Sequence, residues 1–568
     1  MLSYRRVCAK SGTTAGFRDT AGFRDTAGFR DTAGSALALR SNRAYIERIM
    51  DADVLLVGSG HNGLVAAAYL AKWGYKVKVF ERRSTIGGAV CTEEMFGGFR
   101  MDVGGSAHFM IHHTPIVEDL ELARYGLEYI PLDPFMTAPF EDGTGISFYR
   151  DVDATCESIA RISERDAEAY REFIRMWQPL NEAIFELFLK EPTAANIGRT
   201  FAFRKLHRSR AERKEVLRKI FGSYGKLLTD TFESEKMRAA LAWWGAQSGP
   251  PPTDAVTSEF VAWHSVIHKE GPARPKGGSG MLTQALASYI EDHGGEIYSG
   301  VPVDRILVES GSACGIELEG GDRYFTPRII SNAHLWVTFL QLLREWTPPD
   351  LERDVRSVRV GNGFGMVLRC AMDRLPSYGL DTIPDDEIVK GMQLLCPSEQ
   401  YLIDSYADYL RGMPSRDPAA IAMTFSAIDP TLAPEGKHTL FVWGQYYPYS
   451  LRNGSKWPDI RDAEARKLLG VVDRFAPGTS EALIDWYIQS PDQIAEKHNM
   501  PNANVMHVEM SIDQMFMFRP LPELSRYSTP LPGLYLANAG MHPGGGIFGA
   551  PGYACAHAMR RSMPRRRR

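Results

Sequence analysis

A strand, a glycine turn, a helix and a second strand follow one another within residues 53–88, and no other stretch of the chain constrains its fold as strongly. The apolar run at 54–57 predicts a short strand that is buried on both faces. A G-x-G-x-x-G turn follows, and residues 64–72 then predict a helix rich in small side chains. Residues 76–80 predict the second strand, which Glu81 closes 18 residues after the last glycine of the turn. This order is typical of a dinucleotide-binding βαβ unit.

Each part of this unit has a physical role in holding a nucleotide diphosphate. The glycines permit a tight turn and a close approach of the backbone to the phosphates, while the N–H groups at the start of the helix face them. The acid accepts hydrogen bonds from ribose hydroxyls. The residues predicted to hold the pyrophosphate and ribose are Gly58, Ser59, Gly60, Gly63 and Glu81. The motif alone leaves the dinucleotide open between FAD and NAD.

A second glycine-rich turn near the C-terminus separates these two cofactors. Residues 533–539 predict a short buried strand, and the glycine run at 540–552 leads into a helix that begins at Tyr553. Backbone N–H groups and a helix dipole placed in this way suit the electron-rich edge of a flavin, where reduction adds negative charge. Gly87 and Gly88 indicate a further close passage along the same diphosphate. An NAD dehydrogenase needs no such second site, so we predict FAD.

Composition places the chain among ordinary globular proteins and excludes several classes. Of its 568 residues 44% are hydrophobic and 24% charged, and a formal net charge of −4 argues against a nucleic-acid-binding protein. No run approaches the ~18 apolar residues of a membrane span. The seven cysteines are scattered without a C-x-x-C pair, which fits a reducing compartment and no structural zinc. We therefore expect a cytoplasmic protein.

Several histidines are candidates for chemistry. His108, His112 and His113 could pass for metal ligands, but no acid or cysteine completes a set at a useful spacing, and a zinc site needs at least three protein ligands. We therefore expect no metal. His542 is the polar side chain most closely tied to the C-terminal glycine turn. Its role stays open between turn architecture and catalytic contact with the substrate.

Both ends of the chain fall outside the pattern of a folded domain. Residues 15–32 repeat the hexamer AGFRDT three times, and a period of six residues matches neither a helix nor a strand. Disorder is therefore expected for residues 1–49. A mitochondrial presequence is the alternative, although the aspartates of the repeat offset its arginines. At the other end the chain closes with four arginines.

A basic stretch at 204–219 carries eight Lys or Arg residues and is followed by apolar Ile220, Phe221 and Tyr224. Two interpretations stay open, a solvated helix face and a basic amphipathic surface that rests on anionic lipid. The Arg-rich tail is consistent with the second, which would suit an enzyme that takes an apolar substrate from a bilayer. Peripheral attachment to the inner face of a membrane is thus an alternative to a purely cytoplasmic location.

Five motifs along the chain point to one family. They are V-G-S-G-H-N-G-L-V-A-A-A-Y-L with F-E-R-R-x-x-x-G-G in the first unit, P-K-G-G-S-G at 275–280, D-P-T-L-A-P-E-G-K-H at 429–438, M-S-I-D-Q at 510–514 and H-P-G-G-G-I-F-G-A-P-G at 542–552. Together they resemble the phytoene-desaturase-type FAD-dependent oxidoreductases. The chain is most similar to the branch that holds bacterial FAD-dependent β-carotene ketolases and vertebrate pyridine nucleotide-disulphide oxidoreductase domain proteins. The resemblance covers about residues 51–561.

The resemblance implies an α/β fold in which an FAD-binding Rossmann-type domain, of the glutathione reductase and amine oxidase kind, is interleaved with an α+β substrate domain. That substrate domain would carry a helical part, a candidate for facing a membrane. The FAD-binding domain is expected at 50–145, 269–345 and 501–561. The substrate domain is expected at 146–268, which is mainly helical, and at 346–500, which holds sheet and helices. Residues 1–49 would be the disordered repeat and 562–568 the basic tail.

By motif position, the resemblance also implies further cofactor contacts. Arg83 would lie near the adenosine, and Gly87 and Gly88 would lie at the diphosphate. Val303 would meet the adenine through its backbone. The residues expected around the ribityl chain and the flavin ring are Gly540, Gly544, Gly545 and Gly546.

The reaction implied is oxidation of an apolar, isoprenoid or carotenoid-like substrate, by desaturation or ketolation with hydride transfer to the flavin. A small apolar molecule is then the expected partner, and no nucleic acid is. Two alternatives stay open. One is a redox-neutral isomerase or hydratase that acts on a small unsaturated substrate with help from the flavin, and the other is a flavoprotein scaffold without turnover.

Overall fold

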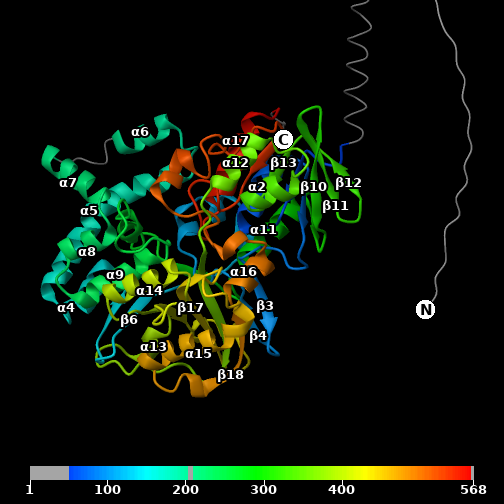
Figure 1. The fold of residues 1–568 in the computed structure, drawn as a ribbon. Helices are drawn as coiled ribbons and strands as arrows, with labels where there is room; N and C mark the ends of the chain where they lie inside the picture. Colours follow the sequence, from blue (N-terminus) through cyan, green and yellow to red (C-terminus); the bar gives the residue numbers. More distant parts are fainter. Residues whose placement is uncertain (1–49, 203–208, 565–568) are drawn as a thin grey trace, which may run out of the picture. The chain divides into compact units, whose positions relative to one another are not determined.

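The computed structural model describes residues 50–202 and 209–564, and Figure 1 shows how their helices and strands are arranged. Three predicted features lie outside the described residues: the repeat at 1–49, the first part of the basic stretch at 204–208, and the four terminal arginines. The described chain contains two large sheets.

The first sheet has five parallel strands in the order β19-β13-β1-β2-β9, so strands from distant parts of the chain lie side by side. They are β1 (Val54–Val57), β2 (Val77–Glu81), β9 (Glu296–Ser299), β13 (Ile329–Ser331) and β19 (Leu534–Leu536). β1 takes the central position because all four of its residues are apolar and buried. Helices α2 (His61–Lys72), α11 (Met281–Asp292) and α17 (Ala550–Arg561) belong to the same core, with α11 and α17 packed against α2.

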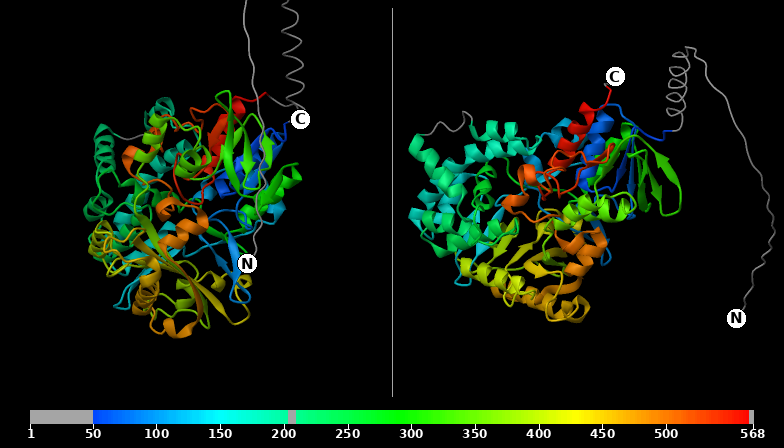
Figure 2. Two further views of the ribbon diagram at one scale, coloured as in Figure 1. Left: turned by 45° about the vertical axis from the view of Figure 1, so that its right-hand side comes forward. Right: turned by 45° about the horizontal axis from the view of Figure 1, so that its top comes forward.

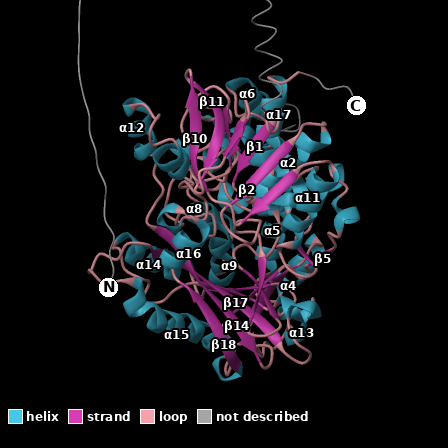
Figure 3. Cartoon of the chain, turned by 90° about the vertical axis from the view of Figure 1, so that its right-hand side faces the viewer, coloured by secondary structure: helices cyan, strands magenta, loops and turns pink. Residues whose placement is uncertain are grey.

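Smaller sheets complete this part of the molecule. An antiparallel sheet of β10 (Val303–Glu309), β11 (Ser312–Leu318) and β12 (Arg323–Phe325) forms the connection from β9 to β13. Two short antiparallel pairs are β3 (Thr92–Met95) with β4 (Phe99–Asp102), and β5 (Tyr129–Pro131) with β8 (Ala273–Pro275). Figure 3 shows β10 and β11 beside β1 and β2.

The second sheet has seven strands in the order β18-β14-β17-β16-β15-β6-β7 and lies below the first in Figure 3. Its strands are β6 (Met136–Pro139), β7 (Gly145–Phe148), β14 (Gly363–Met372), β15 (Met392–Leu395), β16 (Ala420–Met423), β17 (His438–Pro448) and β18 (Leu483–Gln489). Side chains alternate between the two faces of each strand. Leu368 and Val442 pack on the face covered by α15 (Trp457–Phe475), and Val367 and Phe441 belong to the core on the other face.

Helices dominate residues 146–268 and are grouped together in Figure 2. They are α4 (Val152–Ala160), α5 (Glu164–Phe188), α6 (Ala194–Ala202), α7 (Arg210–Ile220), α8 (Tyr224–Thr231), α9 (Glu235–Ala246) and α10 (Glu259–Ala262). α5 begins where Ser163 Oγ accepts a hydrogen bond from the Asp166 N–H and so caps the helix. Trp243 of α9 is fully buried and donates its indole N–H to Ala420 O at 2.8 Å, which joins these helices to the second sheet.

Two elements lie elsewhere than the predicted segment boundaries place them. β6 falls within the segment 50–145 predicted for the FAD-binding domain, but it pairs with β15 and β7 in the second sheet. α12 (Pro349–Ser357) falls within 346–500, yet Val355 and Val358 pack in the core of the first sheet. Short elements contribute few residues to either core, so the sequence shows no break at these points. The remaining helices are α3 (Ile116–Asp119), α13 (Asp385–Ile388), α14 (Glu399–Leu410) and α16 (Pro491–His498).

Within the described ranges, no helix combines the length and the apolar composition that crossing a bilayer requires.

Candidate active site

A cavity of about 400 Å³ is lined by residues of both large sheets and of the segments that connect them. We distinguish two ends. The nucleotide end is lined by Gly58, Gly60, Glu81, Arg83 and Gly88. The substrate end is lined by Val367, Ile421, Met423, Phe441 and Trp443.

The turn that follows β1 accepts only glycine at its closest approaches. Gly58 has a φ of +92°, a conformation that residues with a Cβ rarely adopt. A Cβ at Gly60 would collide with Asn332 Oδ1, and one at Gly63 would lie 2.9 Å from Asn332 Cβ. Asn332 is itself fixed, because its amide side chain donates to the carbonyl of Ala537 just after β19. The residues that follow β13 and β19 therefore hold the turn in place.

The first turn of α2 lies directly behind these glycines. Gly60 is the N-cap of the helix, and no side chain of the described residues caps it. Unsatisfied N–H groups and the positive end of the helix dipole make such a terminus a site for an anion. The nucleotide end thus offers a diphosphate both room and donors.

Glu81 closes β2 and lines the nucleotide end with 6% of its surface exposed. Its Oε2 accepts hydrogen bonds from Ser59 N at 2.9 Å and from Ser59 Oγ at 2.7 Å, and its Oε1 accepts from Arg83 N at 2.9 Å. A carboxylate has about four acceptor positions, so capacity remains for ribose hydroxyls. Ser59 is not among the described residues that line the cavity, and its contacts orient the acid.

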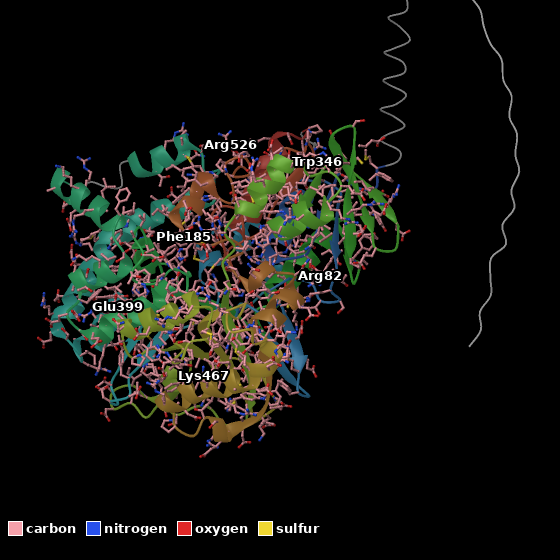
Figure 4. All side chains as sticks on the ribbon, in the orientation of Figure 1. Arg82, Phe185, Trp346, Glu399, Lys467 and Arg526 are labelled. Atoms are coloured by element: carbon pink, nitrogen blue, oxygen red, sulfur yellow. The ribbon has the colours of Figure 1, made fainter. Side chains whose placement is uncertain are left out.

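Basic side chains fasten the two sheets together beside Glu81. Arg83 donates to Gly88 O at 2.9 Å and to Glu93 Oε1 at 2.6 Å. Lys497 of α16 donates to Glu93 Oε2 at 2.7 Å. Arg82, which is labelled in Figure 4, donates to two backbone carbonyls in the last turn of α16. Because α16 follows the edge strand β18 of the second sheet, the nucleotide end is bounded by both halves of the molecule.

The second predicted phosphate contact runs beside the first turn. Gly60 and Gly87 form a parallel bridge, and a Cβ at Gly88 would lie 3.1 Å from Gly60 Cα. Gly88 lines the cavity, whereas Gly87 packs against Thr283. Val303, the first residue of β10, also lines the cavity. The structure therefore brings the predicted Glu81, Arg83, Gly88 and Val303 together with the glycine turn.

The C-terminal glycine run provides less of the cavity wall than the sequence predicts. Gly546 lines the cavity. Three predicted residues are not among the described residues that line it: Gly540, Gly544 and Gly545. The N–H of Gly540 donates to Asn538 Oδ1 at 2.7 Å, and a Cβ at Gly544 would lie 2.9 Å from Met510 Sδ. These glycines permit close packing behind the wall, a distinction that the sequence pattern does not carry.

His542 serves the turn and not the cavity. It is 1% exposed and is not among the described residues that line the cavity. Its ring packs against Phe188 and Phe516 with centroid distances of 5.8 Å, and burial lowers its pKa to about 3. The catalytic role predicted as one alternative is therefore not supported, because neighbouring aromatic rings enclose the imidazole.

The three grouped histidines take part in packing. His108 has Nδ1 at 2.9 Å from Tyr129 Oη and Nε2 at 2.8 Å from Ser279 Oγ. The His113 ring packs against Phe185, which Figure 4 labels. Within the part of the chain that the structure describes, no group of three or more His, Cys, Asp or Glu side chains could hold a metal ion.

The substrate end is built from alternate residues of neighbouring strands. Val367, Trp443 and Ile421 stand opposite one another across β14, β17 and β16, and Phe441 and Met423 form the next row. Directly opposite residues share a face of the sheet, so three strands together form one apolar wall. Among the described residues that line the cavity, those with a carboxylate, ammonium or guanidinium group are Glu81, Arg82 and Arg83. The substrate end therefore offers no ionised partner.

Four histidines that the sequence analysis did not single out also line the cavity: His61, His334, His498 and His507. Burial lowers the pKa of His61 and His334 to about 4 and that of His498 to about 3, and it holds the pKa of His507 well below its usual value. All four are thus neutral near pH 7. His61 lies inside the glycine motif and could have been found there, whereas the other three are isolated in the sequence.

Arg519 is a second feature that the sequence analysis missed. It is fully buried, and among the described residues its hydrogen bonds go to backbone carbonyls alone. The carbonyls are those of Met506, Val508, Glu509, Gln514, Ala539 and Met541. Burial lowers its pKa to about 9, so the guanidinium stays charged at neutral pH. The side chain ties the loop at 506–514 to the segment that follows β19.

The nucleotide end fits FAD on observations of its own. Its glycine cradle would be filled by any Cβ, its helix terminus carries no side-chain cap from the described residues, and its carboxylate retains acceptor capacity. The second strand, turn and helix, from β19 to α17, pack against the first unit. The contact is close, because Gly552 lies against Asn62 O. The donor set is therefore that of a site for a dinucleotide with two phosphates.

Comparison with known proteins agrees with this geometry. The model of the family described as "Flavin containing amine oxidoreductase" matches residues 63–372. The mouse (Mus musculus) "Pyridine nucleotide-disulfide oxidoreductase domain-containing protein 2" is 31% identical over 545 residues, which cover 90% of this chain and 94% of that protein. The "Phytoene desaturase (neurosporene-forming)" of Rhodobacter capsulatus is 27% identical over 87% of this chain and 90% of its own. The family resemblance predicted from the motifs and the prediction of FAD are confirmed.

A solved structure shares the fold. The crystal structure of an oxidoreductase from Methanosarcina mazei superposes with a TM-score of 0.58 and 18% identity, covering 89% of this chain and 99% of that chain. The predicted fold class, α/β with a flavin-binding domain of the amine oxidase kind, is confirmed.

Proposed function

Because the chain belongs to the family of flavin-containing amine oxidoreductases, we propose that it oxidises an apolar substrate of the isoprenoid or carotenoid class by desaturation or ketolation. Whatever its substrate, the chain is an FAD-dependent oxidoreductase of the amine oxidase and phytoene desaturase superfamily.

The observation that carries the proposal is the apolar, uncharged wall of the substrate end. An amine substrate is a cation at neutral pH, and burying it without an ionised partner is costly. The described residues that line the substrate end supply no carboxylate. A hydrocarbon skeleton instead gains about 25 cal/mol for each Å² of apolar surface that it buries against Val367, Phe441 and their neighbours.

The division of the cavity indicates how its residues would act. We assign the pyrophosphate to the turn of Gly58, Gly60 and Gly63, the ribose to Glu81, and the adenine surroundings to Val303. Desaturation removes a hydride and a proton from neighbouring carbons, and FAD, when bound, would supply the acceptor for both and so become reduced. The protein's part is to hold the skeleton against the apolar wall and to exclude water from it.

Purified protein tests the proposal. The absorbance spectrum and chemical identification of the released cofactor should show FAD. In an anaerobic screen, flavin absorbance should bleach with phytoene or a shorter isoprenoid, and expression in a carotene-producing host should yield new pigments. If reductant is required but not consumed, the redox-neutral alternative is correct. If no apolar compound reduces the flavin, the proposed oxidation is wrong.

We also propose that α7 and the residue after it rest on a membrane surface that contains anionic lipid. In the described part of the basic stretch, Arg213, Lys214 and Arg218 are exposed. Leu217 and Phe221 are 55% and 62% exposed, which is unusual for large apolar side chains. Basic groups beside exposed apolar ones suit the interface of an anionic bilayer.

Vesicle flotation tests this contact. Binding to vesicles that contain phosphatidylserine should weaken with salt and fall in the double variant Leu217→Ser/Phe221→Ser. Ile484→Ser is the matched control, because Ile484 is 50% exposed on β18, in the second sheet. Equal flotation of both variants and the parent chain would exclude this surface as the contact.

A further inference from the structure

Among the buried polar side chains that line the cavity is an amide for which the proposed reaction has no use. Gln489, the last residue of β18, is 1% exposed and lines the cavity. Neither its Nε2 nor its Oε1 has a hydrogen-bond partner among the described residues. Buried amides in folded proteins are ordinarily paired, because an unpaired donor or acceptor has given up its water without compensation.

The position of Gln489 belongs to the substrate end. It stands opposite Val367 across β18 and β14, and Val367 stands opposite Trp443 across β14 and β17. All three residues line the cavity. Neighbouring strands are ~4.8 Å apart, so Gln489 and Trp443 are separated by roughly 10 Å on the same face. The amide therefore borders the apolar wall that a substrate would contact.

Gln445 shows how a structural glutamine in the same wall behaves. It is fully buried and lines the cavity, but its Nε2 donates to Ala246 O at 2.8 Å and its Oε1 accepts from Trp443 Nε1 at 2.7 Å. Both ends of its amide are used within the protein. In Gln489 neither the donor nitrogen nor the acceptor oxygen is used within the described chain, so a ligand can pair with both.

We propose that Gln489 is a specificity-determining residue that binds an oxygen atom of the substrate. This inference rests on the proposed function and narrows it: the preferred substrate is an isoprenoid that carries a carbonyl or hydroxyl group, and a pure hydrocarbon binds more weakly. The amide N–H donates to the oxygen, and the amide carbonyl accepts from a hydroxyl. One such contact orients a skeleton that apolar walls alone would bind in several ways.

Three terpenes with one skeleton test the assignment: limonene, a hydrocarbon, carvone, which adds a ketone, and carveol, which adds a hydroxyl. Their affinities for the FAD-loaded protein can be measured from the perturbation of flavin absorbance. One hydrogen bond predicts that the parent chain binds carvone and carveol about threefold to tenfold more tightly than limonene. Gln489→Leu should remove this difference by weakening the two oxygenated probes alone. Ile421→Val is the matched control, because it changes the volume of the same wall and should shift all three affinities together.

Several results would overturn the assignment. The assignment is wrong if the parent chain binds the three probes with equal affinity, or if none of them perturbs the flavin absorbance. It is also wrong if Gln489→Leu still binds the oxygenated probes more tightly than limonene. A fourth is a loss of FAD affinity in Gln489→Leu, measured by titrating FAD into cofactor-free protein, with the probe preference unchanged, since the amide would then serve the cofactor. The proposed function fails by a different result, the absence of flavin reduction by every apolar compound in the anaerobic screen.

Discussion

The nucleotide end and the substrate end of the cavity are built in different ways. The nucleotide end is made mainly of backbone: glycines, a helix terminus and one carboxylate, nearly all within residues 53–88. The substrate end is made of side chains on three separate strands, β14, β16 and β17, which are brought into one wall by their pairing in the sheet. A site made of backbone tolerates few substitutions. In a wall made of side chains, individual residues can be replaced while the strand pairing stays the same. The family can therefore keep one cofactor and vary its substrates.

The largest effect is expected at the nucleotide end. Gly60→Val should lower FAD affinity by more than about 100-fold, because the new side chain would collide with Asn332 and occupy the space of the diphosphate. FAD bound per protein after gel filtration measures this. Gly470→Ala is the control, since a Cβ there meets nothing within 4 Å. A Gly60→Val protein that keeps its full complement of FAD would contradict the assignment of this turn.

The loop behind the C-terminal glycines should be the next most sensitive. Arg519→Met should lower the free energy of unfolding by about 3 kcal/mol or more, because it leaves several buried carbonyls without a donor. Urea unfolding followed by fluorescence measures the loss, and Arg519→Lys, which keeps the charge but not the fork of donors, should recover only part of it. If Arg519→Met is as stable as the parent chain, the six carbonyl contacts do not hold the loop.

Two buried groups, one in each half of the molecule, should change the free energy of unfolding with pH in opposite directions. Burial raises the pKa of Glu259, in α10, from 4.5 to about 8, so the folded state holds a proton that the unfolded state releases. Stability from this group therefore falls as the pH rises from about 4.5 to 8. Burial lowers the pKa of His61 from 6.5 to about 4, so stability from that group falls as the pH drops through this range.

The variant Glu259→Gln separates these contributions. It should reduce the loss of stability on the alkaline side by up to about 4 kcal/mol and leave the loss on the acidic side unchanged. Free energies of unfolding from urea titrations between pH 4 and pH 9 measure both limbs. An alkaline limb as steep in Glu259→Gln as in the parent chain would show that Glu259 ionises normally.

The smallest effect is expected at the substrate end. Trp443→Phe removes the indole N–H that donates to Gln445 at 2.7 Å but keeps an aromatic ring in the wall. Substrate affinity should fall by only about threefold, while FAD affinity stays that of the parent chain. Flavin perturbation by an isoprenoid, together with FAD titration, separates the two. A parallel fall in FAD affinity would show that the ends of the cavity are not independent.

The same contrast explains how much the sequence could predict. Gly58, Gly60, Glu81 and Gly88 were found because their spacing reports local backbone geometry, and the family resemblance added Val303. The C-terminal run was found as a turn, but its pattern could not distinguish glycines that face the cavity from glycines that pack behind it.

Other residues could not be found from the sequence for a physical reason. Gln489 and Trp443 share a wall only because β18, β14 and β17 pair in one register. Arg519 is defined by carbonyls from two segments that meet only after folding. Strand pairing and buried charge are tertiary properties, so no local spacing reveals them.

The anaerobic reduction of bound FAD by paired substrates tests the central claim most directly. Phytoene or a shorter isoprenoid and the diamine putrescine can be mixed separately with the purified, FAD-loaded protein while flavin absorbance is followed. The account predicts bleaching by the isoprenoid and none by the diamine, because the substrate end is apolar and its described lining residues carry no charge. Rapid bleaching by the diamine, with none by any isoprenoid, would contradict it.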